Sequence, residues 1–124
     1  MAKPGSVIGW TLDENERAAL LEQHPPLYAN VVAHHVTLAT EAANRDLPPA
    51  VRAAIVGRAD DGQGVQAMVV TIDGDTARPD GSTFHITWSL GEGRRARESN
   101  DVIRERGWQE LDQPIAISLA PARI

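Results

Sequence analysis

Residues 52–72 have the sequence RAAIVGRA-DDGQG-VQAMVVTI. The two outer segments, 52–59 and 65–72, are rich in apolar and β-branched residues, which favour strands. The segment between them, 60–64, consists mostly of Asp and Gly, which favour a tight turn. This pattern predicts a β-hairpin, and therefore an antiparallel sheet at the centre of the fold.

The rest of the chain supplies more strands than helices. A strand at 6–12 should be followed by a helix that starts at the N-cap Asp13, with Glu16 completing a capping box, and that ends near His24 before two prolines. We expect further strands within 30–39, 83–90 and 114–119, and a short second helix that Ser99 or Asn100 caps and Gly107 ends. Strands do not alternate with long helices, so the sequence predicts an α+β fold with a largely antiparallel sheet and about two helices.

Composition limits the classes of function. A chain of 124 residues has room for one domain, spanning 1–124, and it contains no cysteine, which excludes disulfides and thiol chemistry. The net charge of -5 argues against a groove for duplex nucleic acid, because that partner requires many basic contacts to phosphates. No stretch is apolar enough for a signal segment or a membrane span. We expect a monomeric, cytoplasmic protein that acts on a small ligand and has no membrane partner.

Two of the predicted strands contain the same motif, a histidine, an apolar residue, a threonine and another apolar residue. The motifs are His35-Val36-Thr37-Leu38 and His85-Ile86-Thr87-Trp88. Side chains alternate along a strand, so each motif presents its imidazole and its hydroxyl on one face, about 6 to 7 Å apart. If the two strands flank one cleft, the four polar groups can surround a single phosphate.

This set of groups suits the cleavage of a phosphodiester without a metal or another cofactor. One imidazole can accept a proton from the attacking water while the other donates a proton to the leaving oxygen. Each threonine hydroxyl can donate a hydrogen bond to a non-bridging phosphate oxygen. We therefore predict that His35 and His85 are catalytic, and we favour His85 as the base and His35 as the acid. Thr37 and Thr87 are predicted to bind the phosphate.

The two motifs resemble those of the two-histidine phosphoesterase superfamily. The local sequences AHHVTL (33–38) and FHIT (84–87), followed by Ser99-Asn100, are most similar to small RNA and nucleotide 2′,3′-cyclic phosphodiesterases, such as the cyclic phosphodiesterase domain of fungal tRNA ligases. The resemblance implies a two-lobed β fold with a central cleft. It also implies the hydrolysis of a 2′,3′-cyclic phosphate on a nucleotide, an RNA end or a related molecule, and hence a role in RNA processing.

Four further residues are candidates for substrate binding. Ser89 follows His85 and Thr87 at a spacing of two, so alternation would extend the same row of side chains. Tyr28 could stack on a base at the rim of the cleft. Arg94 and Arg95 lie in a glycine-flanked loop that could close on a phosphate. For each of them a structural or solvent-exposed role is the competing interpretation.

Other aromatic and histidine residues are expected to be structural. Alternation places His34 on the face opposite His35, which predicts a hydrogen-bonding role and argues against a zinc site made of adjacent histidines. The three tryptophans, Trp10, Trp88 and Trp108, are expected in the core. The main alternative to an enzyme is a non-catalytic module that binds RNA ends or phosphorylated nucleotides and uses the histidines only as donors.

Overall fold

The computed structural model describes residues 5–124 and has the expected α+β architecture, with two helices and eight strands in that range. The hairpin predicted from residues 52–72 is confirmed as β4 (Ala53–Asp60) paired antiparallel with β5 (Val65–Ile72). The remaining elements, in chain order, are β1 (Ile8–Leu12), α1 (Glu14–Gln23), β2 (Asn30–Val31), β3 (His35–Ala39), β6 (His85–Leu90), α2 (Glu98–Arg106), β7 (Gln109–Ile117) and β8 (Leu119–Arg123).

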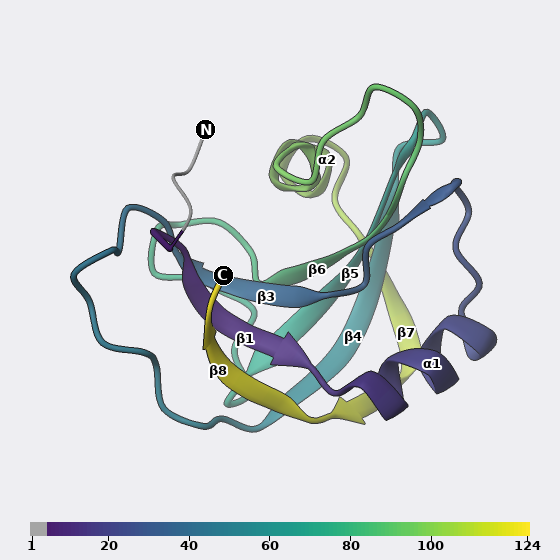
Figure 1. Cartoon of the computed structure of the whole chain (residues 1–124). Helices are drawn as coiled ribbons and strands as arrows, with labels where there is room; N and C mark the ends of the chain where they lie inside the picture. The colour runs from purple at the N-terminus through teal and green to yellow at the C-terminus, as the bar shows by residue number, and fades with distance from the viewer. Residues whose placement is uncertain (1–4) are drawn as a thin grey trace.

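The strands form two antiparallel sheets. One has three strands in the order β3-β1-β8, and the other has five in the order β2-β6-β5-β4-β7. The sequence indicated about six strands. One reason for the larger number of strands is the C-terminal segment. One strand was expected there, at 114–119, but residues 109–123 form two strands. β7 pairs with β4 in the larger sheet, and after Ser118 β8 pairs with β1 in the smaller one. The C-terminal segment thus links the sheets (Figure 1).

Two clusters of buried apolar side chains hold the fold together. The larger lies between the sheets and under α1, and includes Trp10, Leu20 and Trp88, which are at most 5% exposed. The smaller lies between the five-stranded sheet and α2, and includes Ala67 and Val69 of β5 and Val102 and Ile103 of the helix. Figure 1 shows α2 above the face of the sheet that carries this second cluster. β5 is therefore buried on both faces, which accounts for its nearly continuous apolar sequence.

The ends of α1 agree in part with the expected signals. Asp13 is the N-cap, and its carboxylate accepts a hydrogen bond from the backbone N–H of Glu16 at 3.0 Å. The Glu16 carboxylate does not complete the capping box but accepts from the N–H of Ser118 at 2.9 Å, which ties α1 to the junction of β7 and β8. Within residues 5–124, neither helix has the length and apolar character that crossing a membrane requires.

Candidate active site

The backbone brings the two histidine motifs side by side. β2 pairs antiparallel with the end of β6. The residues after β2 stay beside β6 through two more hydrogen bonds, both 2.9 Å long. The N–H of Val32 donates to the carbonyl of Trp88, and the N–H of Ala33 donates to the carbonyl of Thr87. Two residues further in each direction, His35 reaches the level of His85. There the chain leaves the five-stranded sheet, and β3 pairs with β1 instead. The motifs therefore meet where the two sheets diverge (Figure 1).

Ala33 makes this change of sheet possible. Its φ of 42° lies in the left-handed region, which is uncommon for a residue other than glycine, and its side chain is fully buried. Arg17 of α1 holds the segment from the other side, because its guanidinium donates to the carbonyls of Val32 at 3.1 Å and Ala33 at 2.9 Å. The left-handed turn redirects the residues that follow it, His34 and His35.

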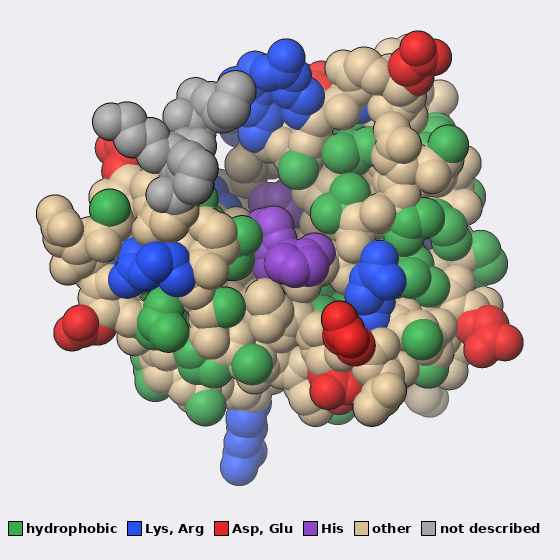
Figure 2. Space-filling model, viewed as in Figure 1, with side chains coloured by type: hydrophobic (Ala, Val, Ile, Leu, Met, Phe, Trp, Pro, Cys, Tyr) green, Lys and Arg blue, Asp and Glu red, His purple; other side chains and the backbone are tan. Residues whose placement is uncertain are grey.

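The imidazoles of His35 and His85 are close enough for their charges to interact. His85 is buried and His35 is half-buried. Burial lowers the pKa of His35 to about 4, and the neighbouring His34 and His85 reinforce the shift. Burial also lowers the pKa of His85, and the guanidinium of Arg78 adds to this, while the Thr83 carbonyl and Asp80 oppose it. Figure 2 shows histidine side chains gathered in a hollow at the centre of this face of the molecule.

Hydrogen bonds restrict which ring nitrogen of His85 carries a proton. Its Nδ1 lies 2.8 Å from the backbone carbonyl of Thr83, and a carbonyl oxygen can only accept. Nδ1 of His85 must therefore be protonated, which leaves Nε2 of the neutral ring as an acceptor. This is the form that a general base requires.

His34 does not point away from His35 as strand alternation predicted. Their Nδ1 atoms are 3.0 Å apart and the two rings meet edge to face. The expectation failed because residues 32–34 are not in a strand, and the left-handed Ala33 breaks the alternation immediately before the motif. His34 is exposed, so it connects the half-buried His35 to solvent. Among residues 5–124, no three His, Cys, Asp or Glu side chains are placed to hold a metal ion together.

A short loop before β6 positions His85. Arg78 is buried and its guanidinium binds the carboxylate of Asp80 through two contacts, at 3.0 and 2.6 Å. The same carboxylate accepts from the N–H of Ser82 at 2.9 Å, and these partners hold the pKa of Asp80 well below its usual range, the Arg78 hydrogen bond most of all. Residues 78 and 80–83 line a hollow of about 380 Å³ with Asn100, Ile103 and Arg104 of α2. The loop fixes the carbonyl of Thr83 beneath His85.

The two threonines have different surroundings. Thr37 is half-buried and lies opposite Gly9 of β1. Thr87 is buried, and its hydroxyl donates to the carbonyl of Ala96 at 3.2 Å and lies 2.9 Å from the hydroxyl of Ser99, which is fully buried in α2. Ser99 is not the cap of α2, as the sequence suggested. The helix begins at Glu98, and Ser99 fixes it to Thr87 instead.

The structure places Ser89 outside the row formed by His85 and Thr87. The register of β5 and β6 shifts between Gln66 and Ala67, so that Thr87 faces Ala67, Ser89 faces Gln66, and Trp88 is the extra residue of a β-bulge. The hydroxyl of Ser89 is fully buried and hydrogen-bonds to the amide oxygen of Gln66 at 2.5 Å. The prediction that Ser89 lines the cleft is therefore corrected, because the bulge reverses the alternation on which it rested.

Tyr28 and Arg94 lie near the turn between β4 and β5, away from His85. The hydroxyl of Tyr28 donates to Asp60 at 2.6 Å, and burial followed by this hydrogen bond raises the pKa of Tyr28. Arg94 forms ion pairs with Asp61 at 2.8 Å and with Glu98 at 3.1 Å. Leu90 of β6 pairs with Val65, the first residue of β5 after this turn. Leu90 is five residues beyond His85, which is about 17 Å along a strand.

Neither Tyr28 nor Arg94 therefore reaches the histidine pair, and both expectations are corrected. Their side chains instead fix the loop before α2 and the segment before β2 to the β4–β5 turn. Arg95 is exposed in the turn before α2, where its backbone N–H donates to Glu98 at 2.6 Å. Among residues 5–124, no hydrogen bond or ion pair ties its guanidinium to the histidines.

Three residues near the site were missed or set aside by sequence reasoning. His34 was assigned to the wrong face, although its adjacency to His35 was a usable signal. Arg78 lies in a turn-rich segment, and only its spacing from Asp80 hints at an ion pair. Ser99 was considered only as a cap, and no local pattern indicates that its hydroxyl meets Thr87.

Comparison with known proteins adds no relative. No protein-family model matches the chain, and neither a curated protein nor a solved structure matches it significantly. The function must therefore be argued from the geometry and chemistry described above.

Proposed function

We propose that this chain is a metal-independent phosphodiesterase that hydrolyses a 2′,3′-cyclic phosphate on a nucleotide, an RNA end or a related molecule. The observation that carries the proposal is the backbone pairing of Val32 and Ala33 with Trp88 and Thr87, which brings His35 of one sheet level with His85 of the other. Two imidazoles brought level on adjoining segments are more than phosphate binding requires, since Arg or Lys would serve that purpose.

The hydrogen bonds favour His85 as the general base. With Nδ1 committed to the Thr83 carbonyl, Nε2 of His85 takes the proton of a water molecule as its oxygen attacks phosphorus. A new P–O bond forms and the bond from phosphorus to the ribose 2′ or 3′ oxygen breaks. The product is a phosphate monoester with one free ribose hydroxyl.

His35 then serves as the general acid that protonates the leaving oxygen. It is neutral near pH 7 without substrate, because its pKa is about 4. A phosphate anion bound between the rings favours the charged form and raises this pKa. In the resulting imidazolium both nitrogens are donors, so Nδ1–H can bond to Nδ1 of His34 while Nε2–H protonates the leaving oxygen.

Thr37 and Thr87 are proposed to donate to the non-bridging oxygens. For Thr87 this requires its hydroxyl to exchange the carbonyl of Ala96 for the phosphate, with Ser99 as the remaining partner. The Thr87 hydroxyl already contacts Ala96 and Ser99, so it is less able to stabilise a transition state. This favours a second candidate function, a module that binds a cyclic phosphate or RNA end without cleaving it.

Turnover of 2′,3′-cyclic AMP, CMP, GMP and UMP in the presence of EDTA tests the proposal. The wild-type chain should open the ring, and His35→Ala or His85→Ala should each slow the reaction by roughly 10²- to 10⁴-fold, the usual contribution of one acid or base. Thr37→Val should lower the rate, whereas Thr40→Val, a matched change at an exposed threonine just beyond β3, should leave it unchanged.

Binding without turnover across this panel and across RNA ends with a cyclic phosphate would support the non-catalytic module instead. Activity that survives both histidine substitutions would refute the acid-base assignment.

A further inference from the structure

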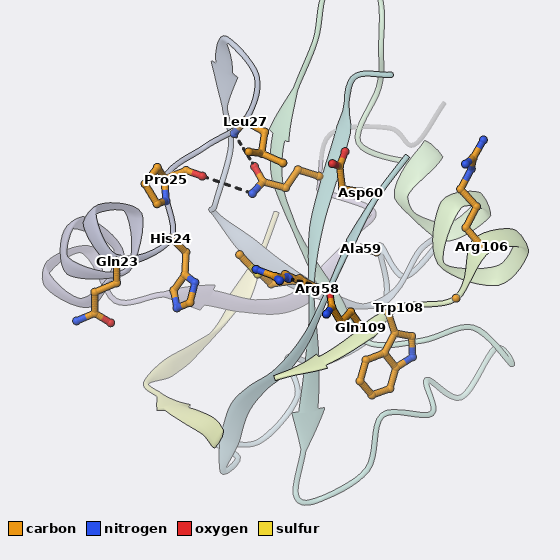
Figure 3. A pocket seen from close by; sticks show the side chains of 13 residues that line it. Gln23, His24, Pro25, Leu27, Arg58, Ala59, Asp60, Arg106, Trp108 and Gln109 are labelled. Carbon is orange, nitrogen blue, oxygen red and sulfur yellow. Dashed lines mark hydrogen bonds between the residues drawn. The ribbon is translucent and has the colours of Figure 1, made fainter. Parts of the chain in front are cut away.

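The burial of Arg78 needs an explanation. Arg78 is 8% exposed, and no other Lys, Arg, Asp or Glu among residues 5–124 is buried. Arg58, by comparison, is exposed in a hollow of about 850 Å³ lined by the end of α1 and by β4, where its Nε donates to Gln109 at 3.3 Å (Figure 3). The cost of taking a charge out of water largely cancels the attraction of its partner, so a buried ion pair is weak evidence for stability. Another role is therefore needed for Arg78.

Arg78 is bound to the short loop that ends at the partner of His85. Its guanidinium donates to the carboxylate of Asp80 at 3.0 and 2.6 Å, and its backbone N–H donates to the carbonyl of Ser82 at 2.9 Å. Asp80 in turn accepts from the backbone N–H of Ser82 at 2.9 Å. The next residue, Thr83, supplies the carbonyl that lies 2.8 Å from Nδ1 of His85. Arg78 and Asp80 thus hold the chain one residue before this carbonyl.

The charges of Arg78 and Asp80 also act on His85. Burial is the main cause of the lowered pKa of His85, and the Thr83 carbonyl opposes it. The guanidinium of Arg78 lowers this pKa further, and the carboxylate of Asp80 raises it. The ion pair is therefore near His85 in space as well as in sequence. Two parallel bonds to one carboxylate fix the direction of the contact as well as its distance.

We propose that Arg78 is a positioning residue for His85, because through Asp80 it holds the loop that aims the Thr83 carbonyl at Nδ1 of His85. A carbonyl can only accept, so this contact keeps the proton on Nδ1 and leaves Nε2 free to act as the base. In a loosened loop the neutral ring would carry its proton on either nitrogen. The fraction protonated at Nε2 could not accept a proton from water.

Nitrogen-15 NMR of the free protein tests this tautomer directly, because a ring nitrogen that carries a proton resonates far from one that does not. At about pH 8 the ring of His85 is neutral, since its pKa lies below 6.5, and its signals are those that disappear in His85→Gln. The wild-type ring should be protonated at Nδ1 alone, whereas Arg78→Gln should show a population protonated at Nε2. A ring that stays protonated only at Nδ1 in Arg78→Gln would overturn the proposal.

The effect on rate rests on the proposed function, and it is measured with the 2′,3′-cyclic nucleotide that the wild-type protein turns over best. Arg78→Gln should lower kcat by roughly 10- to 100-fold, the loss typical for outer partners of metal-bound histidines, with little change in KM. Arg78→Lys keeps the charge but not the two parallel bonds, so it should recover part of this loss.

The coupling of Arg78 to Asp80 is tested with a double variant. Asp80→Asn should also lower kcat, and Arg78→Gln combined with Asp80→Asn should be no slower than the slower single variant, because the two residues act as one unit. Losses that multiply in the double variant would show independent effects and contradict the proposed coupling.

Arg94→Gln is the matched control, because it removes another arginine that pairs with a carboxylate, Asp61 at 2.8 Å, in a part of the chain away from His85. It should leave the tautomer and kcat unchanged, and an equal effect there would refute a specific role of Arg78. If Arg78→Gln does not fold, Arg78→Lys and Asp80→Asn provide the same measurements, since Asp80 is exposed. A wild-type protein that turns over no cyclic nucleotide would refute the proposed function, whereas the tautomer in the variants would still decide the role of Arg78.

Discussion

The contact between Thr87 and Ser99 allows a sharp test of how α2 is held against the sheet. Ser99 is fully buried, and the hydroxyl of Thr87 is the partner of its side chain in the described structure. Thr87→Val keeps the shape of the side chain but leaves the Ser99 hydroxyl without that partner. A buried polar group without a partner costs about 1–3 kcal/mol, so this variant should lose stability of that order.

The reverse substitution should be milder. In Ser99→Ala the hydroxyl of Thr87 still donates to the carbonyl of Ala96, so we expect a loss below about 1 kcal/mol. The carbonyl of Ala96 in turn keeps a bond from the backbone N–H of Ser99 in either variant. In the double variant neither hydroxyl remains, and the protein should recover most of the stability lost by Thr87→Val.

Urea unfolding of the four proteins measures these free energies directly, provided that the slope with denaturant is unchanged. A Thr87→Val variant as stable as the wild type would refute the argument. So would a double variant that loses the sum of the two single effects, because the hydroxyls would then be energetically independent.

Three further predictions concern single residues. Because the pKa of His35 falls from 6.5 in the unfolded chain to about 4 in the fold, the unfolded state binds the extra proton between these pH values. The neutral His35 ring therefore contributes stability above pH 6.5, and this contribution, about 3 kcal/mol, is lost as the pH falls to about 4. His35→Gln should remove this part of the pH dependence, measured as urea midpoints. Gly57→Ala should cost about 1–3 kcal/mol and raise iodide quenching of Trp108, since a Cβ would displace the ring; unchanged quenching would contradict this. Ala33→Gly relieves the strain of a φ of 42° but removes a fully buried methyl group, and each effect is worth about 1 kcal/mol, so the free energy of unfolding should change by less than about 1 kcal/mol; a loss of about 2 kcal/mol or more would count against the strain explanation.

Local sequence signals predicted the elements whose boundaries depend on nearby residues. The hairpin of β4 and β5 follows from two apolar runs around an Asp- and Gly-rich turn, and α1 begins at Asp13 and ends before two prolines as expected. The histidine motifs lie on strands β3 and β6, also as predicted. These features need no knowledge of distant contacts.

The failed predictions share a physical cause, which is an irregularity that only tertiary contacts produce. A bulge opposite Gln66 and Ala67 reverses the direction of Ser89, and the ion pair of Arg94 with Asp61 joins segments thirty-three residues apart. Trp108 packs one side of its ring on the backbone of Gly57, a contact with a distant strand, and stays 37% exposed. Alternation and composition describe regular strands, so they cannot locate the places where a strand is interrupted.

The most consequential interruption is at Ala33, because it changes how the histidine pair can work. A regular strand would have placed His34 in the opposite direction and left Nδ1 of His35 without a second imidazole beside it. The left-handed Ala33 instead brings the exposed His34 within 3.0 Å of Nδ1 of His35, while His85 keeps a backbone carbonyl as its partner. A carbonyl fixes one tautomer, whereas a second imidazole can exchange a proton with its neighbour. The two catalytic candidates are thus unequal in the resting structure, and the inequality favours His85 as the fixed base and His35 as the group that exchanges its proton with solvent.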